Sequence, residues 1–177
     1  MSLRLVLLLA TVVLYFGPTD AALRCRPFYT RFRSRCYRYR GSPALTWVRA
    51  EKSCKADGGH LASVHNKGEE RFMHTLWRTQ RDQHTNTEMM IHFRNERARV
   101  PYVYIGLNDR KENGVYRWTD GSKFNYANWM PRNPSNTVRE NAVFMWDLRS
   151  KGQWNDVIGN DEHLAGAYIC KQRLIRD

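Results

Sequence analysis

The sequence has only one long hydrophobic run, and that run lies at its start. Residues 5–16 are almost wholly apolar, and they stand between the basic residue Arg4 and the chain breaker Gly17-Pro18. The run is too short to span a bilayer, and this order of segments is typical of a secretory signal peptide. We therefore expect residues 1–22 to be a signal peptide, and residues 23–177 to form one secreted, extracellular domain without a membrane span.

Cysteine is also scarce. An even number of cysteines in an exported chain indicates disulfide bonds, and four of them allow three pairings among which their spacing does not choose. No serine or cysteine has an evident general base, and His84 and His92 lack the cysteine or carboxylate companions of a zinc site. We therefore do not expect an enzyme. The four cysteines are Cys25, Cys36, Cys54 and Cys170.

Acidic residues are missing from one segment of the chain. Between Ala21 and Ala50 there are eight arginines and no aspartate or glutamate, in a chain whose net charge is +12 at pH 7. A field of this kind attracts polyanions. For an exported protein we expect the partners to be glycans or acidic polyanionic surfaces and not nucleic acid. The alternative is that the arginines serve only solubility.

Two segments, residues 44–56 and 67–78, have apolar residues at helical spacing. The other apolar residues fall in short segments bounded by glycine, proline and aspartate, which is typical of strands. We expect Gly41-Ser42-Pro43 to break the first strand, and we expect residues 79–101 to be an exposed basic insertion. Two early helices and many short strands predict an α+β fold. The expected strands are residues 37–40, 60–64, 102–107, 115–118, 143–146, 152–154 and 166–170.

Side chains with hard oxygen ligands gather late in the chain. Calcium takes six to eight such oxygens. A cis bond before Pro134, which costs little at proline, would place the side chains on either side of it along one edge of a loop. The alternative is that Asn-Pro-Ser simply forms a solvated turn. The predicted calcium-binding residues are Asn133, Ser135, Glu140, Asn155 and Asp156.

Several short motifs follow one another along almost the whole of residues 23–177. They are Cys36-Tyr37, Trp47 with Ala50-Glu51 and Cys54, Gly59-His60-Leu61-Ala62-Ser63-Val64, Glu69-Glu70 with Phe72, Tyr104-Ile105-Gly106-Leu107-Asn108-Asp109, Trp118-Thr119-Asp120-Gly121, Asn128-Trp129, Trp154-Asn155-Asp156 and Tyr168-Ile169-Cys170. In this order they resemble the C-type lectin-like domain family. The resemblance implies two helices flanking two small antiparallel sheets, with a long ligand-binding loop. It also implies disulfide bonds between Cys54 and Cys170 and between Cys25 and Cys36.

The same resemblance implies a sugar site built around calcium. Sugar-binding members of the family carry Glu-Pro-Asn or Gln-Pro-Asp, then a glutamate, then Asn-Asp after Trp. Here Asn133 and Ser135 replace the usual residues on either side of the proline, whereas Glu140 and the Asn155-Asp156 pair match. An auxiliary calcium would fall to Asp109, Asn113, Asn136, Glu140 and Asn141.

The family usually bridges this loop with a disulfide, and Ala142 and Gly159 stand at the positions of its cysteines. We therefore expect the loop to be held by calcium or by the packing of Trp129, Trp146 and Trp154. Two functions remain open. One is a secreted, calcium-dependent lectin. The other is a basic matrix or biomineral-associated protein that binds acidic surfaces by charge, in which Asp156 only caps backbone amides.

Overall fold

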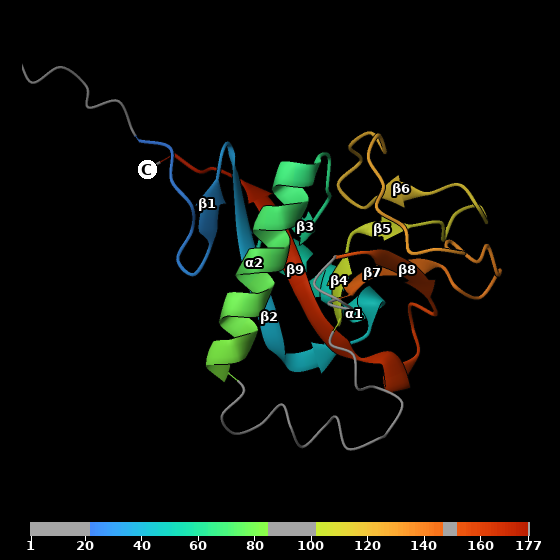
Figure 1. Ribbon diagram of the computed structural model, residues 1–177. Coiled ribbons are helices and arrows are strands. Elements are labelled where there is room, and N and C mark those ends of the chain that lie inside the picture. Colours follow the sequence, from blue (N-terminus) through green and yellow to red (C-terminus); the bar gives the residue numbers. More distant parts are fainter. Residues whose placement is uncertain (1–21, 85–101, 147–151, 177) are drawn as a thin grey trace, which may run out of the picture.

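A seven-stranded sheet forms the centre of the computed structural model, which describes residues 22–84, 102–146 and 152–176 (Figure 1). The strand order is β1-β2-β9-β4-β7-β8, with β3 also paired to β9, and β5 and β6 form a separate two-stranded sheet. The strands are β1 (Thr30–Phe32), β2 (Arg35–Leu45), β3 (His60–Leu61), β4 (Tyr102–Ile105), β5 (Leu107–Asn108), β6 (Arg117–Trp118), β7 (Ala142–Trp146), β8 (Trp154–Val157) and β9 (Gly166–Arg173). The helices are α1 (Trp47–Ala56), α2 (Lys67–His84) and the short 3-10 helix η2 (Glu162–Leu164). This is the predicted α+β fold.

The predicted signal peptide and most of the predicted insertion lie outside the described residues. Within the described parts of the chain, no helix has both the length and the hydropathy needed to cross a membrane.

Strand β2 is longer than the sequence predicts. The expectation that Gly41-Ser42-Pro43 ends the strand is wrong, because β2 continues to Leu45. Its pairing with β9 shifts register between Arg40 and Leu45. Such an irregularity lets a strand accommodate a residue that cannot donate to the ladder. Helix α1 therefore begins only at Trp47, where the side chain of the preceding Thr46 accepts a hydrogen bond from the backbone N–H of Arg49 at 3.4 Å.

Helix α2 is also longer than predicted. It continues to His84, whereas the apolar pattern had placed its end at Arg78. The last apolar residue of the pattern is Trp77, but the polar residues that follow it include no glycine or proline to stop the helix. The first residues of the predicted insertion are therefore helical.

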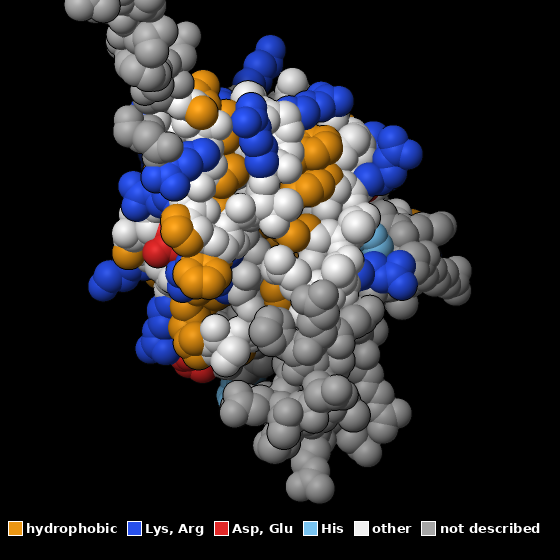
Figure 2. All heavy atoms as spheres, turned by 90° about the vertical axis from the view of Figure 1, so that its left-hand side faces the viewer, with side chains coloured by type: hydrophobic (Ala, Val, Ile, Leu, Met, Phe, Trp, Pro, Cys, Tyr) orange, Lys and Arg blue, Asp and Glu red, His pale blue; other side chains and the backbone are white. Residues whose placement is uncertain are grey.

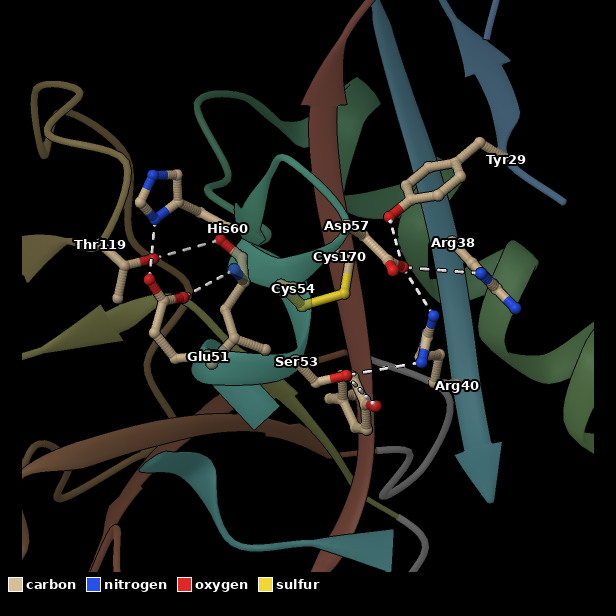
Figure 3. The surroundings of a disulfide bond; sticks show 12 residues. Tyr29, Arg38, Arg40, Glu51, Ser53, Cys54, Asp57, His60, Thr119 and Cys170 are labelled. Atoms are coloured by element: carbon tan, nitrogen blue, oxygen red, sulfur yellow. Dashed lines mark hydrogen bonds and ion pairs between the residues drawn. A yellow bond between two sulfur atoms is a disulfide. The ribbon is translucent and has the colours of Figure 1, made fainter. Parts of the chain in front are cut away.

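Helix α1 is joined to the central strand β9 by the disulfide between Cys54 and Cys170, and a second disulfide joins Cys25 to Cys36 of β2. Both are the pairs that the family resemblance implies. Around Cys54–Cys170 lies one of two buried apolar clusters, which also contains Trp47, Tyr104, Phe144 and Tyr168 (Figure 3 shows this disulfide). The other cluster includes Tyr37, Met73, Trp77, Trp118 and Trp154.

One charged group lies inside the structure between α2 and β9. Glu69, 6% exposed, accepts hydrogen bonds from the ammonium group of Lys171 at 2.5 Å, from the hydroxyl of Tyr37 and from the backbone N–H of His65 at 2.8 Å. Lys171 also donates to the Ser63 backbone carbonyl at 3.0 Å. Every polar atom in this group has a partner, which is the condition for burying charge at acceptable cost.

Candidate functional site

The long loop between β6 and β7 is fastened to strand β8 along a short stretch. The Trp154 backbone N–H donates to the Asn128 carbonyl at 2.8 Å, and the Met130 N–H donates to the Trp154 carbonyl at 2.9 Å. The Trp129 ring lies 5.9 Å from the buried Trp154 ring and 5.0 Å from the Tyr116 ring, in edge-on contacts. Such pairs add to the stability gained by burial. Two of the three predicted tryptophans therefore hold the loop.

The third tryptophan does not. Trp146 packs against Phe144 in the other apolar cluster, with ring centroids 5.2 Å apart. It lies one residue beyond Met145, which pairs with Trp154 in the β7–β8 ladder. Successive side chains of a strand point to opposite faces, so Trp146 points away from the face on which Met145 and Trp154 contribute to the cluster under the loop.

The Trp-Asn-Asp motif lies within strand β8, paired with β7, and not in a turn. Strand alternation places Trp154 and Asp156 on the same face. Asp156 is only 1% exposed. Its two carboxylate oxygens accept the backbone N–H of Ser135 at 2.9 and 2.8 Å, and one of them also accepts the N–H of Asn136 at 3.3 Å. Asp156 therefore holds the backbone of the loop just after Pro134, where the Asn133–Pro134 bond is cis.

Two hydroxyl groups complete the surroundings of Asp156. The Ser135 hydroxyl lies 3.1 Å from Asp156 Oδ2, and the Tyr116 hydroxyl donates to the same oxygen at 3.3 Å. The Ser135 hydroxyl also contacts Glu140 Oε2 and lies 3.0 Å from the hydroxyl of Thr137. Three predicted site residues, Ser135, Glu140 and Asp156, are thus brought together. Neither carboxylate forms an ion pair with any residue in the described ranges.

The two asparagines of the predicted set are less closely connected. The Asn155 amide donates to the backbone carbonyl of its neighbour Asp156 at 3.0 Å. The Asn133 amide donates to the Pro131 carbonyl at 3.4 Å. Among the described residues, no side-chain hydrogen bond joins either asparagine to Ser135 or Glu140. Both side chains are half-buried, so part of each faces solvent at the edge of the loop.

The residues of the predicted auxiliary site lie in separate local contacts. Asp109 accepts the Gly114 N–H at 2.8 Å, and its other oxygen is buried without a partner. The Asn141 oxygen accepts a hydrogen bond from the Arg110 guanidinium at 2.9 Å. The Asn113 amide donates to the Asn136 carbonyl at 3.2 Å. A guanidinium therefore already uses one of the oxygens that the auxiliary calcium would need.

The carboxylates under the loop affect the pKa of Tyr116. Its burial raises the pKa of its hydroxyl, and the nearby carboxylates of Asp156 and Asp109 raise it further, with Glu140 also contributing. The sequence analysis did not select Tyr116. Its spacing two residues before the buried Trp118 was the available signal, because residues at that spacing share one face of a strand.

The arrangement leaves few unoccupied oxygens for a calcium ion. The ion takes six to eight oxygens, but both oxygens of Asp156 already accept N–H groups and Glu140 is the only other carboxylate in the set. Nowhere in the described part of the chain do three or more His, Cys, Asp or Glu side chains form a group that could hold a metal. Calcium binding by the five residues stays a prediction.

Comparison with known proteins places the chain in a family. The family model described as Lectin C-type domain matches residues 43–172. An alpha-N-acetylgalactosamine-specific lectin of Patiria pectinifera is 31% identical over 161 residues, which cover 86% of this chain and 84% of that lectin. The chain therefore belongs to the C-type lectin domain family, which consists of binding domains and not enzymes.

Other relatives are larger or differ in what their descriptions say. The versican core protein of Bos taurus is 32% identical over 82% of this chain, but the matched region spans only 4% of versican. A calcium-independent type II antifreeze protein has 26% identity and a TM-score of 0.69, over 87% of this chain and 98% of that one. The carbohydrate-recognition domain of cow CD23, solved with an oligosaccharide, has 25% identity and a TM-score of 0.64, over 86% of this chain and 98% of that one.

Proposed function

We propose that the protein is a secreted lectin that binds carbohydrate at the loop edge formed by Asn133, Ser135, Glu140 and Asn155, while Asp156 holds the loop from beneath. The observation that carries the proposal is the pair of hydrogen bonds from the Ser135 N–H to the buried Asp156 carboxylate. They fix the backbone of a loop that is otherwise exposed from Ser135 to Arg139. A fixed loop loses less conformational freedom when it binds.

The chemistry of these side chains suits sugar hydroxyl groups. Glu140 can only accept hydrogen bonds, whereas the amides of Asn133 and Asn155 can both donate and accept. Hydrogen bonds to a charged acceptor are stronger than neutral ones, so Glu140 is the main polar contact. The relationship to the lectin of Patiria pectinifera, whose name gives specificity for alpha-N-acetylgalactosamine, supports this class of ligand.

The calcium-dependent form of this proposal requires Asp156 to exchange its N–H partners for a metal. We propose direct hydrogen bonding as the simpler form, because it keeps the contacts of Asp156 that exist. The two forms differ in one respect that can be measured, since a chelator abolishes sugar binding only in the calcium-dependent form.

The test is a titration of the purified protein with N-acetylgalactosamine and a panel of monosaccharides, in millimolar calcium and again in a chelator. Glu140→Gln keeps the size of the side chain and removes its charge. We expect it to weaken binding roughly 10- to 100-fold, as is typical for the loss of a hydrogen bond to a charged group. The matched control is Glu112→Gln, which removes an exposed carboxylate paired with Arg117 in the turn between β5 and β6 and should leave binding unchanged.

Two results would contradict the proposal. One is that no sugar binds under either condition. The other is that Glu140→Gln and Asn155→Ala bind as tightly as the original protein. Secretion has its own test, in which the protein collected from the medium of expressing cells should lack the first 21 or 22 residues by mass spectrometry.

A further inference from the structure

The hairpin formed by β1 and β2 carries arginines at the edge of the sheet. Among the described strands β1 pairs only with β2, and Arg33 and Ser34 form the turn between them, with Arg33 at a positive φ of 52°. In the ladder Arg31 lies opposite Cys36 and Phe32 lies opposite Arg35. Residues opposite each other in an antiparallel pair are about 5 Å apart. The arginines of the hairpin, at 31, 33 and 35, are therefore concentrated around one narrow tip.

These arginines differ from their neighbours in how their charge is compensated. Arg38 and Arg40 of β2 both form ion pairs with Asp57, at 3.5 and 2.6 Å (Figure 3). Within the described ranges, no carboxylate pairs with any arginine of the tip. The guanidinium of Arg31 donates to the Leu23 carbonyl at 3.2 Å and to the Arg33 carbonyl at 3.0 Å, and that of Arg35 donates to the Ser34 carbonyl at 3.1 Å. Backbone carbonyls orient a guanidinium without cancelling its charge.

An aromatic side chain extends this positive surface. Phe28 is 81% exposed and has a positive φ of 68°, and the guanidinium of Arg38 lies 5.1 Å from the centre of its ring. The guanidinium of Arg26, also without an ion pair among the described residues, lies beside Gly58 at the end of α1. Figure 2 shows the face that contains the hairpin, where Lys and Arg side chains are spread around apolar patches and acidic side chains occupy only small spots.

We propose that this surface, made by Arg26, Phe28, Arg31, Arg33 and Arg35, binds a sulfated glycosaminoglycan chain. Guanidinium groups form paired hydrogen bonds with the oxygens of sulfate and carboxylate groups. A ring as exposed as that of Phe28 offers a flat apolar surface to the C–H face of a sugar. The charges of a linear polyanion repeat along its length, so that successive charges can each pair with a different arginine. A secreted protein meets sulfated polysaccharide more readily than nucleic acid.

This surface is separate from the loop proposed to bind sugar. Figure 1 places β1 on one side of the sheet and the segments around β5, β6 and β8 on the other. Both can therefore be occupied at once, so that the protein would link a sulfated chain to a second glycan. The inference does not depend on the loop site, and each can fail without the other.

The test measures binding of the full mature chain to immobilised heparin at an ionic strength of about 0.15 M, where surface charges are screened beyond about 8 Å. The variant R31Q/R33Q/R35Q should bind roughly 10- to 100-fold more weakly, because each arginine near an anionic surface adds to the attraction. The matched control K111Q/K123Q/R139Q loses the same charge from exposed positions outside the hairpin. It should weaken binding by less than about threefold.

Further measurements identify the partner and check that each variant is folded. N-desulfated heparin should bind more weakly than heparin, and Glu140→Gln should bind heparin as the original protein does. The melting temperature of each variant is measured, and Arg35→Gln alone serves if the triple variant is unstable. Equal weakening in both triple variants would overturn the proposal, because net charge alone would then explain binding. Tighter binding to duplex DNA or to phosphatidylserine vesicles than to heparin would overturn the choice of partner.

Discussion

Glu69 and Asp156 are two of the buried carboxylates in this protein, and their charges are compensated in different ways. Glu69, between α2 and β9, has a lysine ammonium at 2.5 Å as well as a tyrosine hydroxyl and a backbone N–H. Asp156, under the loop, has a tyrosine hydroxyl, a serine hydroxyl and backbone N–H groups, but no cation from the described residues. The first carboxylate is neutralised by a side chain of the central strand. The second depends on hydrogen-bond donors, most of which the loop supplies.

The two carboxylates differ in which part of the chain supplies their partners. Lys171 lies on β9, which is fixed by its neighbours and by the disulfide at Cys170, so the partner of Glu69 cannot leave. The partners of Asp156 come mainly from residues 135 and 136 of the loop, and the Tyr116 hydroxyl is its partner from outside the loop. A buried charge with incomplete compensation has a strong preference for the loop conformation that supplies its donors. The loop is therefore ordered by Asp156 without a disulfide.

The largest effect should come from breaking the pair around Glu69. Lys171→Met leaves Glu69 buried without a cation, and breaking a buried ion pair in this way costs about 3–5 kcal/mol of unfolding free energy. Urea unfolding followed by tryptophan fluorescence measures this loss. The matched control is Arg49→Met, because Arg49 pairs with Glu162 at 3.2 Å and the two side chains are 63% and 61% exposed. The control should cost less than about 1 kcal/mol.

The comparison would fail if Arg49→Met cost as much as Lys171→Met. A double variant tests whether the loss comes from the unpaired charge of Glu69. Lys171→Met combined with Glu69→Gln removes both charges, and it should recover part of the stability that Lys171→Met loses.

A smaller and more local effect is expected at Asp156. Asp156→Ala leaves the backbone N–H groups of Ser135 and Asn136 without their charged acceptor, and hydrogen bonds to a charged group are worth about 1.5–3 kcal/mol. Amide hydrogen exchange should accelerate at residues 135 and 136 while the amides of β9 keep their protection. Sugar binding should be lost, because the loop edge is no longer fixed.

The same variant decides between the two forms of the sugar site. If the original protein melts at a higher temperature in millimolar calcium and Asp156→Ala abolishes that rise, Asp156 exchanges its N–H partners for the metal. If the original protein shows no rise, Asp156 acts only on the loop. Loss of protection throughout β9 in Asp156→Ala would contradict the local role altogether.

Much of this arrangement could be predicted from the sequence, but only where residue type determines position. The spacing of Trp47, Ala50 and Cys54 predicts the buried face of α1 because a helix repeats every 3.6 residues. The motif from Trp154 to Asp156 predicts that a carboxylate reaches the loop. Residue type does not determine which donors that carboxylate meets, since an aspartate can accept from a metal, a hydroxyl or an N–H.

The errors at β2 and α2 have a related cause. Pro43 and the polar end of α2 carry local preferences that are weak compared with pairing and packing. Strand β9 holds Leu45 in the ladder at Gly166 in spite of Pro43. Similarly, we predicted that Trp146 packs under the loop because it is a tryptophan. The face of β7 on which its side chain lies determines instead that it packs in the other apolar cluster.

Low pH should destabilise the protein by protonating Glu69. Burial on its own would raise the pKa of this carboxyl, but hydrogen bonds from Lys171 and Tyr37 outweigh burial and lower the pKa below its usual value. A lowered folded-state pKa contributes stability that is fully present above the unfolded value of about 4.3. That stability is lost as the pH falls through the folded-state pKa. The unfolding free energy of the original protein should therefore fall between about pH 5 and pH 3, and fall less in Glu69→Gln. Equal losses in the two proteins would exclude Glu69 as the group responsible.

The last comparison concerns the tyrosines that donate to Glu69 and to Asp156, and the smallest effect is expected at Tyr116. Tyr37→Phe and Tyr116→Phe each remove one hydroxyl and keep the ring, whose contacts with Phe72 at 5.1 Å and with Trp129 at 5.0 Å remain. A hydrogen bond to a charged group is worth about 1.5–3 kcal/mol. Tyr37 should fall within that range, because its hydroxyl is buried with Glu69. Tyr116 should fall below about 1 kcal/mol, because its 3.3 Å bond is long and Asp156 keeps its N–H donors.

Urea unfolding of the two phenylalanine variants measures these losses side by side. If Tyr116→Phe costs as much as Tyr37→Phe, the hydroxyl of Tyr116 is a principal partner of Asp156, and the loop N–H groups are secondary to it. Asp156 would then be held mainly by the segment that leads into β6, and the loop could leave without exposing an uncompensated charge. The contrast between a fixed and a loop-dependent carboxylate would no longer hold. A small loss in Tyr116→Phe, together with faster exchange at residues 135 and 136 in Asp156→Ala only, supports the N–H groups as the partners that order the loop.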